Sequence, residues 1–144
     1  MEVIRPTDVQ YAVIARKAFH YTVETEKTPE QAIEKLTEAL KEEKFGVLWQ
    51  LDMKAKLQEK GVDFNQNFHI LEVCNPVEAK RVLSENSLVG YFLPCKIAVY
   101  EEKGKTQIGL PKPTALIGLV ENDNLMAIAT DIEKRLIACV VKSK

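Results

Sequence analysis

The sequence has few of the residues from which disulfide frameworks and many active sites are built. It contains 3 cysteines, 2 histidines and 1 tryptophan in 144 residues. An odd number of widely spaced cysteines does not make a disulfide framework and fits a reducing compartment. We interpret them as free thiols. The N-terminus also lacks the basic and apolar regions of a signal peptide, so we expect a cytoplasmic protein.

Long apolar runs and an excess of charge of one sign are also absent. Apolar stretches such as 115–120 are far shorter than the ~20 residues that a membrane-spanning helix requires. The 20 Lys and Arg residues nearly balance the 21 Asp and Glu residues, and no basic cluster stands out. These patterns disfavour a membrane or a nucleic acid as partner.

Motifs that bind phosphate, metal or an acyl group are missing as well. There is no glycine-rich phosphate loop and no Gly-x-Ser-x-Gly nucleophile motif. The candidate metal ligands lack the close paired spacing of zinc sites; they are His20, His69, Cys74 and Cys95. We therefore expect neither a metal nor a cofactor.

What the sequence does contain is typical of one globular domain. Apolar residues make up 46% of the chain and charged residues 28%, and the length suits a single hydrophobic core. Regular patterns cover residues 18–144, the predicted domain. Residues 1–17 are a predicted extension, in which the apolar segment 11–15 would be a strand or a docking arm buried across a partner.

Five segments have strand patterns. Residues 19–23 alternate between apolar and polar side chains, and residues 45–51 alternate with Phe45, Val47, Trp49 and Leu51 on one face. Residues 68–74 are apolar on both faces, which predicts a central, doubly covered strand. Residues 94–101 and 106–110 flank a turn and predict a β-hairpin with Gly104 at positive φ. Trp49 and Tyr100 are interpreted as core residues.

Capping signals predict where the helices begin. Thr28, followed by Pro29 and Gln31, forms a capping box, and Asn75 before Pro76 predicts a second helix. A short helix follows Asp52, and a long amphipathic helix extends from a cap at 122–123 to about residue 140. Together the elements predict an α+β fold, a two-layer sandwich with a mixed or antiparallel sheet and helices packed on one face.

Three segments, in their order along the chain, resemble a known family. They are Phe-His-Ile-Leu-Glu-Val-Cys-Asn-Pro at 68–76, Leu-Pro-Cys-Lys-Ile-Ala-Val-Tyr-Glu at 93–101, and Pro-Thr-Ala-Leu at 113–116. Over roughly residues 18 to 140 the chain is similar to a widespread prokaryotic family known only as domain of unknown function 302. The resemblance implies a compact α+β domain that tends to form dimers, with no established activity, substrate or cofactor. The Pro-Cys element more often continues with Arg in that family, whereas this chain has Lys96.

Cys74 is the strongest chemical candidate in the sequence. It ends a predicted strand directly before a helix whose first N–H groups would favour a thiolate. The alternative is a small buried residue, because free cysteine is among the most buried residue types. Cys95 begins a strand beside Lys96 and is predicted to face the core, and Cys139 lies on the apolar stripe of the last helix.

These observations leave three functional hypotheses, and they do not decide whether the protein is an enzyme. The first is a small dimeric ligand-binding or regulatory domain that binds a small molecule near Cys74, Asn75, Cys95 and Lys96. The second is a thiol-dependent redox or sulfur-handling enzyme or sensor, with Cys74 as nucleophile and Cys95 as resolving thiol. The third is a purely structural subunit.

Overall fold

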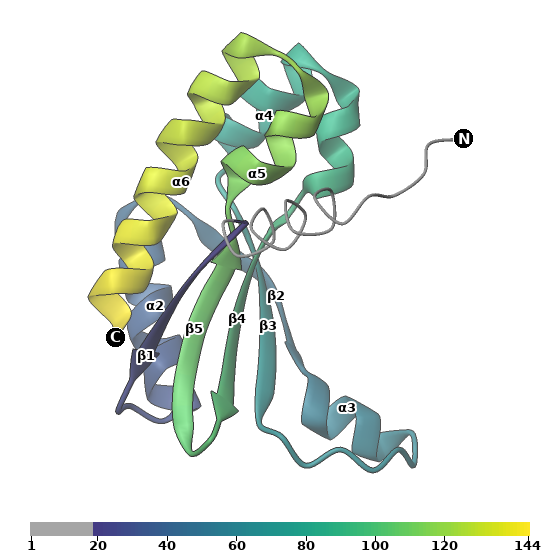
Figure 1. The fold of residues 1–144 in the computed structure, drawn as a ribbon, viewed down its shortest axis with the longest axis vertical. Coiled ribbons are helices and arrows are strands. Elements are labelled where there is room, and N and C mark those ends of the chain that lie inside the picture. The colour runs from purple at the N-terminus through teal and green to yellow at the C-terminus, as the bar shows by residue number, and fades with distance from the viewer. Residues whose placement is uncertain (1–18) are drawn as a thin grey trace, which may run out of the picture.

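The computed structural model describes residues 19–144, in which five strands form one antiparallel sheet (Figure 1). The strands are β1 (His20–Thr25), β2 (Gly46–Asp52), β3 (Phe68–Cys74), β4 (Cys95–Glu102) and β5 (Lys105–Pro111), in the spatial order β1-β5-β4-β3-β2. The helices are α2 (Pro29–Glu42), α3 (Met53–Glu59), α4 (Pro76–Glu85), η1 (Ser87–Phe92), α5 (Pro113–Ile117), η2 (Gly118–Val120) and α6 (Asp123–Ser143). The predicted α+β sandwich is confirmed.

The capping signals act as the sequence predicts. The Thr28 hydroxyl accepts a hydrogen bond from the Gln31 backbone N–H at 3.2 Å, and the Gln31 side chain accepts one from the Thr28 N–H at 3.1 Å. Asn122 caps α6 by accepting from the Leu125 N–H at 3.0 Å. Each cap provides partners for N–H groups that have none inside the helix, so these starts are determined locally.

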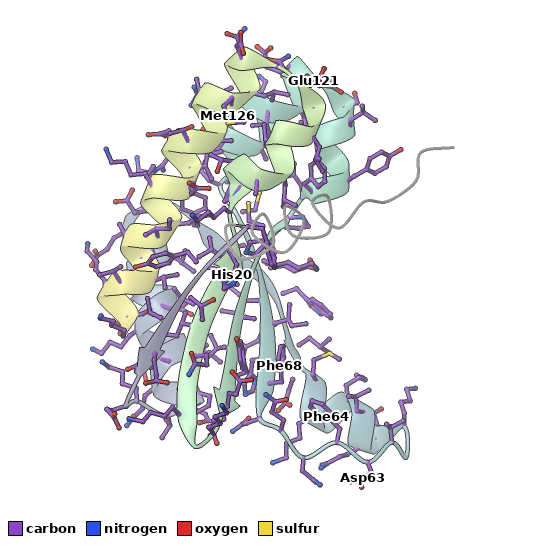
Figure 2. All side chains as sticks on the ribbon, viewed as in Figure 1. His20, Asp63, Phe64, Phe68, Glu121 and Met126 are labelled. Atoms are coloured by element: carbon purple, nitrogen blue, oxygen red, sulfur yellow. The ribbon has the colours of Figure 1, made fainter. Side chains whose placement is uncertain are left out.

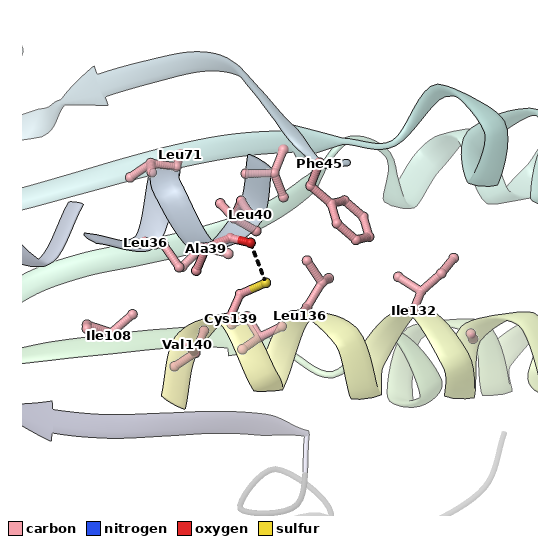
Figure 3. Close-up of a cluster of buried hydrophobic side chains, with 14 of the residues drawn as sticks. Leu36, Ala39, Leu40, Phe45, Leu71, Ile108, Ile132, Leu136, Cys139 and Val140 are labelled. Carbon is pink, nitrogen blue, oxygen red and sulfur yellow. Dashed lines mark hydrogen bonds between the residues drawn. The ribbon is translucent and has the colours of Figure 1, made fainter. Parts of the chain in front are cut away.

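Helices α2 and α6 cover one face of the sheet and form the core with it (Figure 3). Leu36 and Leu40 of α2 and Leu136 of α6 are fully buried against inward-facing strand residues such as Leu71. Cys139 is also buried, with its thiol directed at the Ala39 carbonyl oxygen 3.5 Å away. The predicted core position of Cys139 is confirmed.

Within residues 19–144, no helix crosses the middle of the opposite face of the sheet, and here three strand predictions were wrong (Figure 1). A β-bulge between Val47 and Trp49 reverses the alternation of β2, so Trp49 lies on the uncovered face and is 49% exposed. Tyr100 also lies there, half-buried, instead of in the core. The central strand is β4, and β3 is covered by helices on one face only.

Beyond one end of the sheet, α4, α5 and η1 gather beside the first half of α6 (Figure 1). The sequence predicts α4 but neither η1 nor α5, because both are short and lack a periodic apolar stripe. No helix within residues 19–144 is long and apolar enough to cross a membrane. The predicted extension, residues 1–17, lies outside the described residues.

Candidate functional site

The junction between β3 and α4 places Cys74 and Asn75 at the end of the sheet. The Asn75 side chain accepts hydrogen bonds from the N–H groups of Val77 at 3.0 Å and Glu78 at 3.2 Å. Asn75 is buried and Pro76 follows at the first helical position, so the main role of the Asn75 amide is to cap α4. Cys74 is half-buried directly before this cap.

Cys95 begins β4 and stands opposite Val73 in the neighbouring strand. It shares the wall of a small cavity of about 20 Å³ with Cys74, so the structure brings the two cysteines together as free thiols. Burial, with a smaller effect from the neighbouring Cys74, raises the pKa of the Cys95 thiol to about 11. Cys95 is therefore protonated at neutral pH, which is unfavourable for a nucleophile.

Lys96 points to the uncovered face of the sheet, away from Cys95. Its Nζ donates to Glu72 Oε1 at 3.2 Å, a cross-strand ion pair between β4 and β3. The Lys96 side chain is 58% exposed, so this pair contributes little to stability. Its position matters more, because Lys96 and Glu72 both lie in the wall of the pocket described next.

A pocket of about 300 Å³ lies where the ends of β4 and β5 meet η1, α5 and α6. Its deepest residues, Val82, Val89 and Ala129, are almost fully buried. The remaining wall is mostly aliphatic, aromatic or proline: Tyr91, Phe92, Leu93, Pro94, Cys95, Pro111, Pro113, Leu116, Ile117 and Ile132. Volume and lining both fall within the range of small-molecule sites.

The sequence predicted the residues on one side of this pocket but not those on the other. Cys95 and Lys96 line it, whereas Cys74 and Asn75 lie in the wall of the adjoining small cavity. The residues that sequence reasoning missed come from η1, α5 and the inner side of α6. The apolar run 88–93 was a possible signal, since it follows a helix without any pattern of its own.

A second hollow, of about 440 Å³, lies on the uncovered face of the sheet. We call it the open-face groove; its walls include Phe68 and Tyr100 at one end and Phe19 and His20 at the other. Figure 2 shows His20 and Phe68 at opposite ends of the sheet. The groove and the pocket share Lys96 and Pro111, so they are neighbours.

The histidines and acidic residues offer little for metal binding. His20 is exposed and approaches the Thr22 hydroxyl at 2.9 Å. His69 is buried, with Nε2 at 3.2 Å from Asn67 Oδ1 and Nδ1 without a hydrogen-bond partner. Across residues 19–144, no three His, Cys, Asp or Glu side chains are grouped so that they could hold a metal ion.

Comparison with known proteins places this geometry in a family. The chain matches the family described as domain of unknown function DUF302 over residues 21–142. It is also similar to the crystal structure of an uncharacterized conserved protein DUF302 from Bacillus stearothermophilus, with 58% sequence identity and a TM-score of 0.85 over 88% of this chain and 98% of that chain. No curated protein matches it. The resemblance found in the sequence is thereby confirmed, and the chain belongs to the DUF302 family.

Proposed function

We propose that this protein is a small ligand-binding or regulatory domain that works as a homodimer. The observation that carries the proposal is the pocket of about 300 Å³, whose apolar wall is closed at the bottom by Val82, Val89 and Ala129. Pockets of this size and lining usually take a small organic molecule. The proposal includes a cytoplasmic location, which the free state of the three cysteines supports.

The chemistry of the wall restricts the ligand to a mostly apolar molecule. Among the residues that the structure describes, the only charged side chains in the wall are those of the Glu72–Lys96 pair. A charged group pushed between Val89 and Ala129 would lose its hydration without gaining a partner, at a cost of several kcal/mol. Any polar part of the ligand should therefore remain beside the ion pair, in contact with water.

A thiol-dependent function is the second candidate, and the observation in its favour is that Cys74 and Cys95 share one cavity wall. With a peroxide as oxidant, two thiols would form a disulfide while hydrogen peroxide is reduced to two waters. The raised pKa of Cys95, to about 11, weakens this candidate, because the thiol that resolves an oxidised Cys74 must attack as a thiolate, and little Cys95 thiolate is present at neutral pH.

The pocket can be tested with one blocking substitution and a matched control on the same helix. Ala129→Phe fills the bottom of the pocket, whereas Ala127→Phe adds the same ring on the exposed side of α6. We would titrate each protein with the neutral fluorescent dye N-phenyl-1-naphthylamine, and analyse molecules that co-purify from the native host by mass spectrometry.

We expect wild-type protein and Ala127→Phe to bind the dye alike, and Ala129→Phe to bind at least tenfold more weakly. Circular dichroism would show that both variants are folded. Equal dye binding by Ala129→Phe and wild type would contradict the proposal, as would the absence of any co-purifying molecule or partner together with no dye binding.

A further inference from the structure

The uncovered face of the sheet has the composition of a surface that something covers. Phe68 and Tyr100 stack on it with ring centroids 4.9 Å apart and an angle of 12° between the rings. Ile70, Ala98 and Pro111 continue the apolar lining of the open-face groove toward the other end of the sheet. A contiguous apolar hollow on a sheet surface usually marks a contact site.

Small residues in the two inner strands create the hollow. Ala98 and Gly109 stand opposite each other in β4 and β5, and Gly109 stands opposite Thr22 in β1. A Cβ atom on Gly109 would lie 2.6 Å from the Thr22 hydroxyl oxygen, so a side chain there would displace Thr22. The groove is therefore hollow where Ala98 and Gly109 lie, because neither residue has a large side chain to fill it.

The chain enters the sheet at the edge of this groove. Phe19 and His20, the first two described residues, both line it. The Phe19 carbonyl oxygen accepts a hydrogen bond from the Lys112 N–H at 2.6 Å, which fixes the entry point beside the last residues of β5. Residues 1–18 thus join the described part of the molecule at the rim of an apolar groove.

The preceding residues have the composition that the groove requires. Val9, Tyr11, Val13 and Ile14 are large and apolar, Ala12 lies between them, and the small residues Ala15 and Ala18 follow. The sequence pattern gave this segment no place within a two-layer domain, which is why a partner was expected to cover it. The uncovered face provides such a place on the same chain.

We propose that residues 9–18 dock in the open-face groove of their own chain. Adjacent strands are ~4.8 Å apart, so the path from β1 to β3 is roughly 14 Å, which about five extended residues or about ten helical residues can span. Val9 lies ten positions before Phe19, so an extended segment reaches both Ile70 and Phe68, whereas a helical segment, about 15 Å long, reaches β3 near Ile70 only. This inference does not depend on the ligand pocket.

Limited trypsin digestion of the full-length protein tests the inference, because the segment carries cleavage sites after Arg16 and Lys17. Ala98→Glu places a charge on the floor of the groove and should release the segment. Ala138→Glu is the matched control, since Ala138 is exposed on α6 and does not line the groove. Tyr100→Ser removes part of the groove wall without adding charge and serves as the second variant.

We expect cleavage after Arg16 and Lys17 to be at least tenfold faster in Ala98→Glu and faster in Tyr100→Ser, with Ala138→Glu equal to wild type. Circular dichroism shows whether each variant is folded. If Ala98→Glu is unfolded, the digestion of Tyr100→Ser tests the inference in its place. Rapid cleavage of the wild type, or protection that neither groove variant changes, would overturn the inference. Sedimentation of the same proteins shows whether a second copy of the chain covers the groove instead. If the wild type is a dimer and Ala98→Glu is a monomer, a second copy covers the groove and the inference is wrong.

Discussion

At the scale of single residues, the three cysteines differ in what surrounds their thiols. Cys139 is buried under α2 and Cys95 lies in the wall of two hollows, whereas Cys74 is half-buried at a strand end. Burial raises the pKa of both Cys95 and Cys139. The thiolate fractions of Cys95 and Cys139 at neutral pH are therefore small, which leaves Cys74 as the candidate reactive thiol.

We predict that Cys74 is alkylated faster than Cys95 and Cys139 at pH 7. With a pKa of about 11, only roughly one in ten thousand Cys95 thiols is ionised at that pH. Iodoacetamide labelling of the native protein, followed by peptide-level mass spectrometry, measures the three rates separately. If Cys74 remains unlabelled until denaturant is added, it is a packing residue and the thiol-dependent function should be abandoned.

The raised pKa of Cys95 also predicts that the folded protein loses stability at alkaline pH. The folded state holds the Cys95 proton up to a pKa of about 11, against an ordinary value of 9.0. The stability that results is complete below pH 9 and is lost as the pH rises through 11, because the unfolded chain ionises first. The free energy of unfolding should fall by at most about 3 kcal/mol across this interval.

Urea unfolding at several pH values checks this prediction. Cys95→Ala should show a smaller decrease in the free energy of unfolding between pH 9 and pH 11 than the wild type, whatever its stability at pH 7. Parallel curves for the two proteins would mean that Cys95 does not titrate differently in the folded and unfolded states.

At the scale of secondary-structure elements, Arg135 links three helices. It projects from α6 and donates through Nη2 to the Glu43 carbonyl oxygen at 2.9 Å, just after α2. Its Nε lies 3.2 Å from Glu43 Oε2, and its Nη1 lies 3.4 Å from Glu78 Oε1 in α4. The guanidinium also lies over the ring of Phe45, 5.1 Å from its centroid.

We predict that Arg135→Met destabilises the protein by about 2 kcal/mol. The substitution keeps most of the aliphatic volume but leaves the Glu43 carbonyl oxygen without its Arg135 donor. It also removes one of the two arginine partners of the half-buried Glu78, which keeps its ion pair with Arg81. Lys142→Met is the control, because the Lys142–Glu42 pair is exposed on both sides and should cost less than about 0.5 kcal/mol. Urea denaturation measures both, and equal effects would mean that the Arg135 network adds nothing beyond a surface ion pair.

Elements whose signals are local were predictable from the sequence. The Thr28, Asn75 and Asn122 caps and the hairpin with Gly104 depend on contacts between residues at most a few positions apart. The bulge that turns Trp49 away from the core was not predictable, because it is defined by the pairing of β2 with β3.

The candidate site was only half predictable for the same reason. Cys95 and Lys96 were found because they stand at a strand start. The pocket that they line forms only when η1, α5 and α6 meet the ends of β4 and β5, and those elements are far apart in the sequence. The spacing of residues along the chain does not predict how these distant elements pack together.

At the scale of the whole molecule, the end formed by α4, η1 and η2 exposes large apolar side chains. Val77, Leu88 and Leu119 are more than half exposed, and Tyr91 is 84% exposed. Such side chains gain little from their own domain and gain more when a second molecule covers them. This end is therefore the surface at which the proposed homodimer should form.

We predict that the wild-type protein sediments as a dimer at tens of micromolar, and that Tyr91→Ser weakens the association at least tenfold without changing the fold. Tyrosine at the centre of an interface commonly contributes more than 1 kcal/mol to binding, and an 84% exposed ring contributes little to the stability of its own domain. Leu48→Ser is the matched control, because Leu48 is 62% exposed at the bulge of the edge strand β2 and belongs to none of α4, η1 and η2. Analytical ultracentrifugation over a concentration series measures both dissociation constants. A monomeric wild type would refute the dimer. If Leu48→Ser weakens the association and Tyr91→Ser does not, the interface lies at the β2 edge, where an unpaired strand can pair with that of a second copy.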